Sequence, residues 1–166
     1  MKSVQFTLAD KLTLQDLMFH HIHEILLVAS PYDSFVLEED GRLTEQILHE
    51  YMGMNFSNAP RVWQASTAED ALTMLSRQDF DLIIVMMRIA DMDPVLFCSK
   101  IKEIYPKKPV ILLAFDESEI KQLPEDFEKS AIDRVFIWSG NANVLLAIVK
   151  MIEDAMNIRR DIKKAD

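Results

Sequence analysis

The stretch from Asp81 to Pro94 is the part of the sequence best placed to hold reacting groups. Residues 82–87 form an unbroken apolar run of strand length, which is typical of a central strand in a parallel sheet covered by helices on both faces. In such sheets, ligands and reacting groups lie just beyond the carboxyl ends of the central strands. Met86, Met87 and Arg88 occupy that position. None of them is a usual nucleophile, and none is expected to bind a hard cation.

Four carboxylates near the same expected edge are the other candidates for chemistry: Asp33, Asp91, Asp93 and Asp116. Asp93 precedes Pro94, and Asp116 stands three residues before Glu119, which are patterns of helix N-termini. Asp33 falls at the expected start of a helix. We therefore expect structural roles for these carboxylates, and the alternative is a relocated metal or phosphorylation site.

Composition excludes several other kinds of site. The chain has three glycines and no GxGxxG or GxxxxGK[ST] motif, which excludes a Rossmann dinucleotide site and a P-loop. A net charge of −9 argues against nucleic acid as a partner. No apolar run approaches the roughly 18 residues that a membrane span needs. Cys98 is the single cysteine, and with no signal peptide we expect a reducing cytoplasm, no internal disulfide and no cofactor.

The elements that would position these residues alternate along the chain. The expected strands are residues 25–28, 61–65, 82–87, 110–113 and 135–138. The expected helices cover 13–21, 33–52 with an interruption at 38–41, a stretch from the capping pair Ser66 and Glu69 to about 78, Pro94 to just before Pro106, a short or irregular segment after Asp116, and a last helix capped by Asn141.

Five alternations of strand and helix predict an α/β fold. We expect a flavodoxin-like doubly wound five-stranded parallel sheet, of strand order 2-1-3-4-5, with helices on both faces. The expected organisation is an N-terminal arm and short helix at 1–23, one domain at 24–157, and a charged C-terminal tail or linker at 158–166.

Local strings within residues 24–157 resemble the receiver domains of bacterial two-component response regulators. They are EILLV, ASTAEDAL, FDLIIVMMRIADMDP and KKPVILLA. The third is the closest, because receivers typically read DLIIxDxxMPxMDG there. The residues that keep this pattern are Asp81, Leu82, Ile83, Ile84, Met92 and Asp93. The resemblance implies the receiver fold and a regulatory role in signal transduction, with no enzyme activity in the isolated chain.

Receivers autophosphorylate on an aspartate, and the resemblance implies where each part of that chemistry would fall. The acidic pair that holds Mg²⁺ falls on Ala29 and Ser30. The phosphoaccepting aspartate falls on Met86, and the hydroxyl after the fourth strand falls on Ala114. The lysine after the fifth strand falls on Ile137 or Trp138.

All of these groups are changed, and Ser30 alone keeps a polar side chain. A thioether cannot form an acyl phosphate, and alanine, serine and methionine offer no good Mg²⁺ site. The resemblance therefore predicts a degenerate pseudo-receiver that binds no metal and is independent of phosphorylation. Two alternatives stay open. The chain could be a working receiver that uses a displaced aspartate, or a flavodoxin-like domain that binds a small hydrophobic ligand in the pocket made apolar by Met86 and Met87.

Phe136 and Trp138 are candidates for an interface with a partner. Receivers bind partners through the fourth helix, fifth strand and fifth helix, and large aromatic side chains near a surface are favoured anchors. We expect another protein or domain to dock on this face, or a homodimer to form through it, with no nucleic acid and no membrane as partner. The alternative is that Trp138 only seals the former pocket.

A second resemblance concerns the strings LLVASPYDSFVLEEDGRL and AIDRVFIWSGNANVLLAIVKMIEDAMN. They look like the amino-terminal receiver-like module of large bacterial proteins related to phosphoenolpyruvate synthase and pyruvate, phosphate dikinase. This implies a regulatory head whose catalytic domains would lie outside the present chain.

Overall fold

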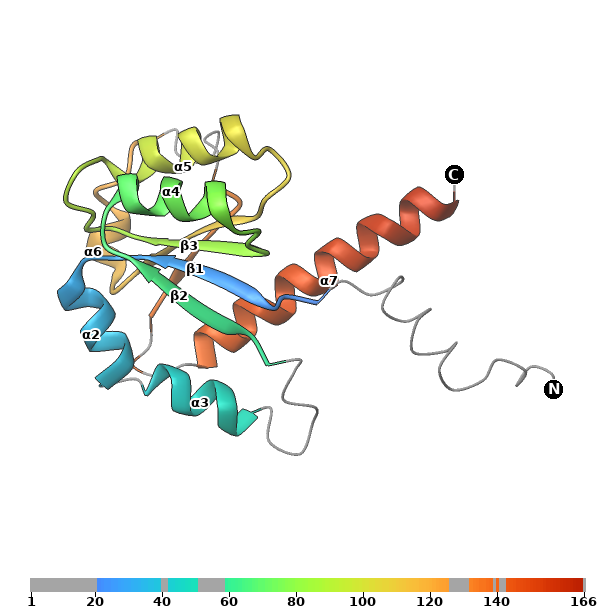
Figure 1. Ribbon diagram of the computed structural model, residues 1–166, viewed down its shortest axis with the longest axis horizontal. Coiled ribbons are helices and arrows are strands. Elements are labelled where there is room, and N and C mark those ends of the chain that lie inside the picture. Colours follow the sequence, from blue (N-terminus) through green and yellow to red (C-terminus); the bar gives the residue numbers. More distant parts are fainter. Residues whose placement is uncertain are drawn as a thin grey trace.

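The computed structural model of the chain (Figure 1) describes residues 21–39, 42–50, 59–125, 132–138, 140 and 143–165. At residue 50 and residues 158–165 it describes the backbone only. The helix expected at 13–21, apart from its last residue, lies outside the described residues, and so does the expected cap Asn141.

The sheet has five parallel strands in the order β2-β1-β3-β4-β5, which confirms the expected flavodoxin-like doubly wound fold. The strands are β1 (Glu24–Val28), β2 (Arg61–Ala65), β3 (Leu82–Met86), β4 (Val110–Ala114) and β5 (Arg134–Ile137). Every residue of β3 and β4 is buried. This burial explains the continuous apolar runs, because a central strand of such a sheet packs against helices on both faces.

Helices cover both faces of the sheet (Figure 1). The helices α2 (Pro31–Glu39), α3 (Leu43–Glu50) and α7 (Asn143–Ala165) lie on one face, and α4 (Ala68–Arg77) and α5 (Pro94–Ile104) lie on the other. Successive β3 side chains alternate between two core clusters: Ile84 and Met86 join the cluster under α7, and Ile83 and Val85 join the one under α4 and α5. The short α6 (Glu117–Ile120) follows β4.

The start of α4 differs from the expectation. The capping residue is Thr67 rather than Ser66, and its hydroxyl oxygen accepts a hydrogen bond of 3.0 Å from the backbone N–H of Asp70. The sequence holds two overlapping patterns, Ser66 with Glu69 and Thr67 with Asp70, and both fit the preferences of a helix start. The helix begins at Ala68, which selects the second pattern.

The long helical stretch expected over 33–52 is two helices, α2 and α3. Arg42, just before α3, has a left-handed φ of 49°, which is incompatible with a continuous helix. At the other end of the chain, α7 runs without a break through residue 157, so residues 158–165, expected as a tail or linker, are helical. Among the described helices, none combines the length and apolar composition required to cross a membrane.

Candidate functional site at the carboxyl edge of the sheet

The positions that would hold receiver chemistry lie together at the carboxyl edge of the sheet and are mostly buried. Ala29, Met86 and Ala114 are fully buried, and Trp138 is 7% exposed. Ala29, Met86 and Trp138 belong to the same hydrophobic cluster. Ile137 is the exception, since it is partly exposed on the edge strand β5. The positions that correspond to the reaction centre of receivers are thus mostly a closed part of the core.

Ser30 keeps its hydroxyl, but local structure already uses that group. Its side-chain oxygen accepts a hydrogen bond of 3.1 Å from the backbone N–H of Asp33, and its carbonyl accepts one of 2.9 Å from Ser34. Its own N–H donates to the carbonyl of Arg88 at 3.1 Å. Ser30 therefore caps the start of α2, and its N–H links the segment after β1 to the segment after β3 by a hydrogen bond.

The structure places Trp138, a candidate interface residue, in the core, where it is 7% exposed. The side chains of Phe136 and Trp138 point to the face that α7 covers, and both pack in or against the cluster that contains Leu145 and Ile148. The alternation along a strand sends Ile137 to the opposite side. Trp138 is therefore a core residue that closes the former pocket, and docking on the surrounding face stays a prediction.

An enclosed apolar cavity lies beside the former pocket. It has a volume of about 10 Å³. Its lining residues are Ile25, Leu27, Leu37, Leu43, Val62, Ile84, Leu113, Trp138 and Leu145. A space of this size is at the lower limit for a single water molecule. This cavity therefore offers no room for a small hydrophobic ligand.

The main polar feature of this edge is an ion pair that sequence reasoning missed. The Arg88 guanidinium donates from Nη2 to Oδ1 of Asp33 at 2.7 Å and from Nε to Oδ2 at 3.3 Å. The side chain of Asp33 is 1% exposed, whereas that of Arg88 is 57% exposed. The Arg88 Cζ atom also lies 5.8 Å from the centre of the Phe115 ring. The hydrogen bonds from Arg88 to the Asp33 carboxylate, followed by their charge attraction, raise the pKa of Arg88 above its usual value.

The ion pair joins two segments that are distant in the sequence. Asp33 follows β1 and Arg88 follows β3, and these strands are neighbours in the sheet. Strand order, together with the opposite charges of two residues that follow adjacent strands, is the signal that could have predicted the pair. From the sequence, Asp33 was expected at a helix start, with a relocated metal or phosphorylation site as the alternative.

The other three carboxylates at this edge bind helix amides. Asp93 accepts hydrogen bonds from the N–H groups of Val95 and Leu96 at 3.0 and 3.1 Å. Asp116 accepts one from Glu119 at 3.0 Å. These contacts confirm Asp93 and Asp116 as helix caps. A hydrogen bond from the Ser118 hydroxyl, followed by the one from the Glu119 N–H, lowers the pKa of Asp116.

Asp91 caps a helix that is remote in the sequence. Its two carboxylate oxygens accept from the N–H groups of Ala68 at 2.8 Å and Glu69 at 3.1 Å, at the start of α4. The hydrogen bond from Ala68 is the main cause of the lowered pKa of Asp91. All four carboxylates therefore have structural partners. Across the described ranges, no three or more His, Cys, Asp or Glu side chains are grouped so that they could hold a metal ion.

Cys98 is a core residue of α5. Its side chain is fully buried, and burial raises the pKa of its thiol to about 12. The thiol is therefore protonated near neutral pH, and only the thiolate is a good nucleophile.

Among the comparisons with known proteins, the one with solved structures gives matches. No model of a protein family matches the sequence, and no curated protein does either. A CheY-like response regulator receiver domain protein from Methanospirillum hungatei is similar, with a TM-score of 0.61 and 19% identity over 83% of this chain and 98% of that one. A CheY-like receiver domain from Methylobacillus flagellatus has a TM-score of 0.59 and 13% identity over 80% and 99%.

The response regulator TrrA from Thermotoga maritima, solved in complex with Mg²⁺ and beryllofluoride, has a TM-score of 0.58 and 19% identity over 78% of this chain and 98% of its own. At such identities, the likeness is one of fold. The chain therefore has the fold of the receiver domains of two-component response regulators.

Proposed function

We propose that this chain is a receiver-like regulatory module of bacterial signal transduction that acts through protein contacts and not through phosphoryl transfer. The observation that carries the proposal is the complete burial of Met86 at the position of the phosphoaccepting aspartate. Its neighbours at that edge, Ala29 and Ala114, are also fully buried and apolar. A phosphoryl donor would find neither a nucleophile nor a metal ligand at these positions.

The remaining carboxylates support the same proposal. Asp33 and Asp91 accept hydrogen bonds with both carboxylate oxygens, so phosphorylation of either would have to displace its arginine or a helix amide. Asp93 and Asp116 accept through Oδ1, and phosphorylation there would weaken the helix caps that this oxygen forms. Transfer to a displaced aspartate would therefore compete with the local structure that this aspartate stabilises.

The ion pair between Arg88 and Asp33 supports a fixed conformation of this edge. It connects the segment after β3 with the first turn of α2 and needs no added group to form. We infer that a partner recognises one constant surface of this module, and that regulation comes from the presence or absence of that partner.

The face formed by α6, β5 and α7 is our proposed site for a partner domain. This placement rests on the analogy with receivers, and the exposed side chain of Ile137 on β5 provides apolar surface there. The strings shared with phosphoenolpyruvate synthase-like and pyruvate, phosphate dikinase-like proteins support a role as the regulatory head of a larger enzyme. In that arrangement, the catalytic work belongs to other domains.

The test is a titration of the isotope-labelled chain with Mg²⁺ and beryllofluoride, followed by amide NMR. We expect no saturable shifts around residues 29–33, 86–93 or 114–116, and no mass increase after incubation with acetyl phosphate. The Thermotoga maritima regulator, whose structure holds Mg²⁺ and beryllofluoride, is the positive control. Saturable shifts confined to this edge, or a phosphorylated peptide that contains one of its four aspartates, would establish the working-receiver alternative instead.

A further inference from the structure

The last helix extends beyond the domain that it helps to build. Helix α7 contains 23 residues, so it is about 34 Å long at 1.5 Å per residue. Among its described side chains, Met156 is the last one packed against the core. Figure 1 shows the carboxyl-terminal part of α7 projecting away from the sheet. The helix therefore continues beyond the last of its described side chains that packs against the core.

One apolar stripe of α7 faces the core, and its last described side chain is Met156. Leu145, Ile148, Val149 and Ile152 are buried on that stripe, and Met156 packs against the same cluster. The sequence positions that continue this stripe are Arg159, Arg160 and Lys163. The change from apolar to basic residues is expected where a helix leaves its core, because the continuing face meets water.

A second stripe stays apolar to the end of the helix. It consists of Met151, Ala155, Ile158, Ile162 and Ala165. The spacing alternates between four and three residues, which is the a and d pattern of a coiled coil. The side chains of Met151 and Ala155 are exposed, so the domain does not cover the described part of this stripe.

We propose that the α7 helices of two copies of this chain pair in parallel along residues 151–165 and form a short two-stranded coiled coil. The Asp154–Arg159 charge pair supports a second copy as the occupant and a parallel orientation, whereas Asp161 at the next g position faces Asp166 at the following e position and opposes pairing at the end of the helix. With Met151 and Ile158 at d positions, Asp154 falls at a g position and Arg159 at the following e position. In a parallel pair, a g residue faces the next e residue of the partner, so two symmetry-related Asp154–Arg159 contacts form across the seam.

An antiparallel pair would place like positions opposite each other and would lose this complementarity.

Another candidate occupant of the apolar stripe is the amino-terminal segment 1–20 of the same chain. The N–H of Ile22 donates to Glu153 Oε2 at 2.6 Å, so Ile22 lies beside the middle of α7. The Asp154–Arg159 pair favours a second copy, and the experiment separates the two occupants.

The test is sedimentation velocity of the full chain over a range of concentrations. We expect association that depends on concentration, because only about two heptads contribute and short helices are marginal by themselves. The Ile158→Ser/Ile162→Ser variant should be monomeric. The matched control Arg160→Ser/Lys164→Ser introduces the same residues outside the seam and should associate like the parent. A monomeric parent at every concentration, or equal association of both variants, would overturn the proposal.

Two further variants test the orientation. Arg159→Asp should weaken dimerisation about tenfold, because two exposed attractive pairs become repulsive, and Asp154→Arg/Arg159→Asp should restore it. An Ala165→Cys chain should form disulfide-linked dimers on oxidation in a parallel pair, with little interference from the buried Cys98. No linkage, together with no rescue by the charge exchange, would exclude the parallel pair. A monomeric parent that dimerises only after deletion of residues 1–20 would assign the stripe to that segment instead.

This inference does not depend on the proposed lack of phosphoryl transfer. Beryllofluoride binding would refute the silent module and leave the association result unchanged, and a monomeric chain would refute the coiled coil alone.

Discussion

Two arginines at opposite edges of the sheet each lie between a carboxylate and an aromatic ring. At the carboxyl edge, Arg88 binds Asp33 at 2.7 Å, and its Cζ atom lies 5.8 Å from the centre of the Phe115 ring. At the amino edge, Arg61 lies 3.7 Å from Glu24, and its Cζ atom lies 5.0 Å from the centre of the Trp63 ring. Both sites combine an arginine, a carboxylate and an aromatic ring, but the two carboxylates differ in burial.

The side chain of Asp33 is 1% exposed, and that of Glu24 is 25% exposed. Glu24 also accepts a hydrogen bond from the Trp63 ring N–H, so its charge does not depend on Arg61 alone. Asp33 depends on Arg88, because a buried charge without a partner is strongly destabilising. We therefore expect the arginine–carboxylate pair to matter for stability at the carboxyl edge and to contribute little at the amino edge.

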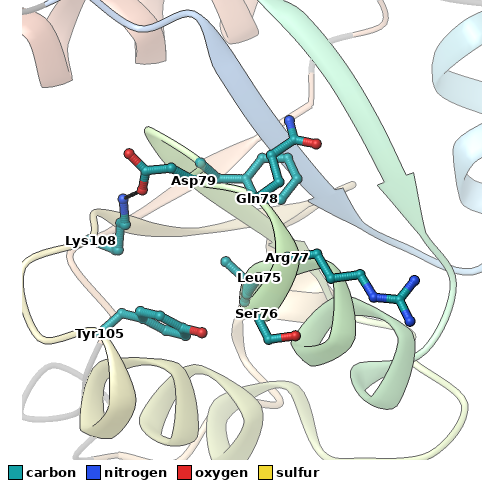
Figure 2. A pocket seen from close by; sticks show the side chains of 8 residues that line it. Leu75, Ser76, Arg77, Gln78, Asp79, Tyr105 and Lys108 are labelled. Atoms are coloured by element: carbon teal, nitrogen blue, oxygen red, sulfur yellow. Dashed lines mark hydrogen bonds and ion pairs between the residues drawn. The ribbon is translucent and has the colours of Figure 1, made fainter.

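The amino edge also has a groove, with a volume of about 270 Å³. Figure 2 shows Leu75 and Tyr105 in its wall and the Asp79–Lys108 ion pair at its side. The Asp79 side chain is 81% exposed there. Water therefore solvates the charges of this groove, whereas the carboxyl edge excludes water from Met86 and Asp33.

The largest expected effect comes from a second buried carboxylate at the carboxyl edge. Met86→Asp should lower the free energy of unfolding by about 3–5 kcal/mol, because the new charge has no arginine within its cluster. Urea denaturation measures the loss. Met86→Leu is the control and should cost less than about 1.5 kcal/mol. A Met86→Asp protein more stable than the parent would refute the interpretation of this edge as a dry core.

The two arginines themselves provide the next test. Arg88→Ala should destabilise by about 1–3 kcal/mol, because it leaves a buried carboxylate without its donor. Arg61→Ala should cost about 0–1 kcal/mol, as for other exposed ion pairs. Both are measured by urea denaturation at the same ionic strength. Equal losses would show that burial of the carboxylate does not distinguish the two edges.

A double-mutant cycle sharpens the same comparison. Asp33 and Arg88 should show a coupling energy of about 1–3 kcal/mol when each is replaced alone and together, because each group is needed to satisfy the other. Replacing both by Asn and Met should cost less than Arg88→Ala alone, since no buried charge remains. Coupling between Glu24 and Arg61 of the same size would contradict the difference between the edges.

The smallest expected effect concerns acid. Two backbone N–H groups at the start of α4 lower the pKa of Asp91 in the folded chain. A depressed folded pKa stabilises the protein above the unfolded value near 3.9, and this contribution is lost as the pH falls through the folded value. Asp91→Asn should therefore be less stable than the parent at pH 7, and the difference should shrink below about pH 4.

Thermal unfolding from pH 7 to pH 3 measures this effect. Asp79→Asn at the amino edge is the control and should change stability less at pH 7, because the carboxylate that it removes is highly exposed. An Asp91→Asn protein whose difference from the parent stays constant down to pH 3 would argue against the capping role of Asp91.

Local sequence patterns were sufficient to predict the strands, two helix caps and a residue at position 86 that cannot accept a phosphoryl group. Each strand was predicted to within one residue at either end. The central strands β3 and β4 are buried on both faces and must be apolar, and turns interrupt the runs. Asp93 and Asp116 were predicted as caps because their hydrogen bonds reach two or three residues along the chain. The prediction that Met86 cannot accept a phosphoryl group follows from residue type alone, since a thioether cannot become an acyl phosphate.

Only the tertiary structure decided which distant groups meet. Asp33 and Arg88 are 55 residues apart, and Asp91 reaches amides 22 and 23 residues earlier in the chain. Trp138 is buried because α7 covers that side of β5, whereas the side chain of Phe35 in α2 is 60% exposed. The physical reason is that local propensity acts over a few residues, whereas burial and ion pairing depend on strand order and on which helix covers which face of the sheet.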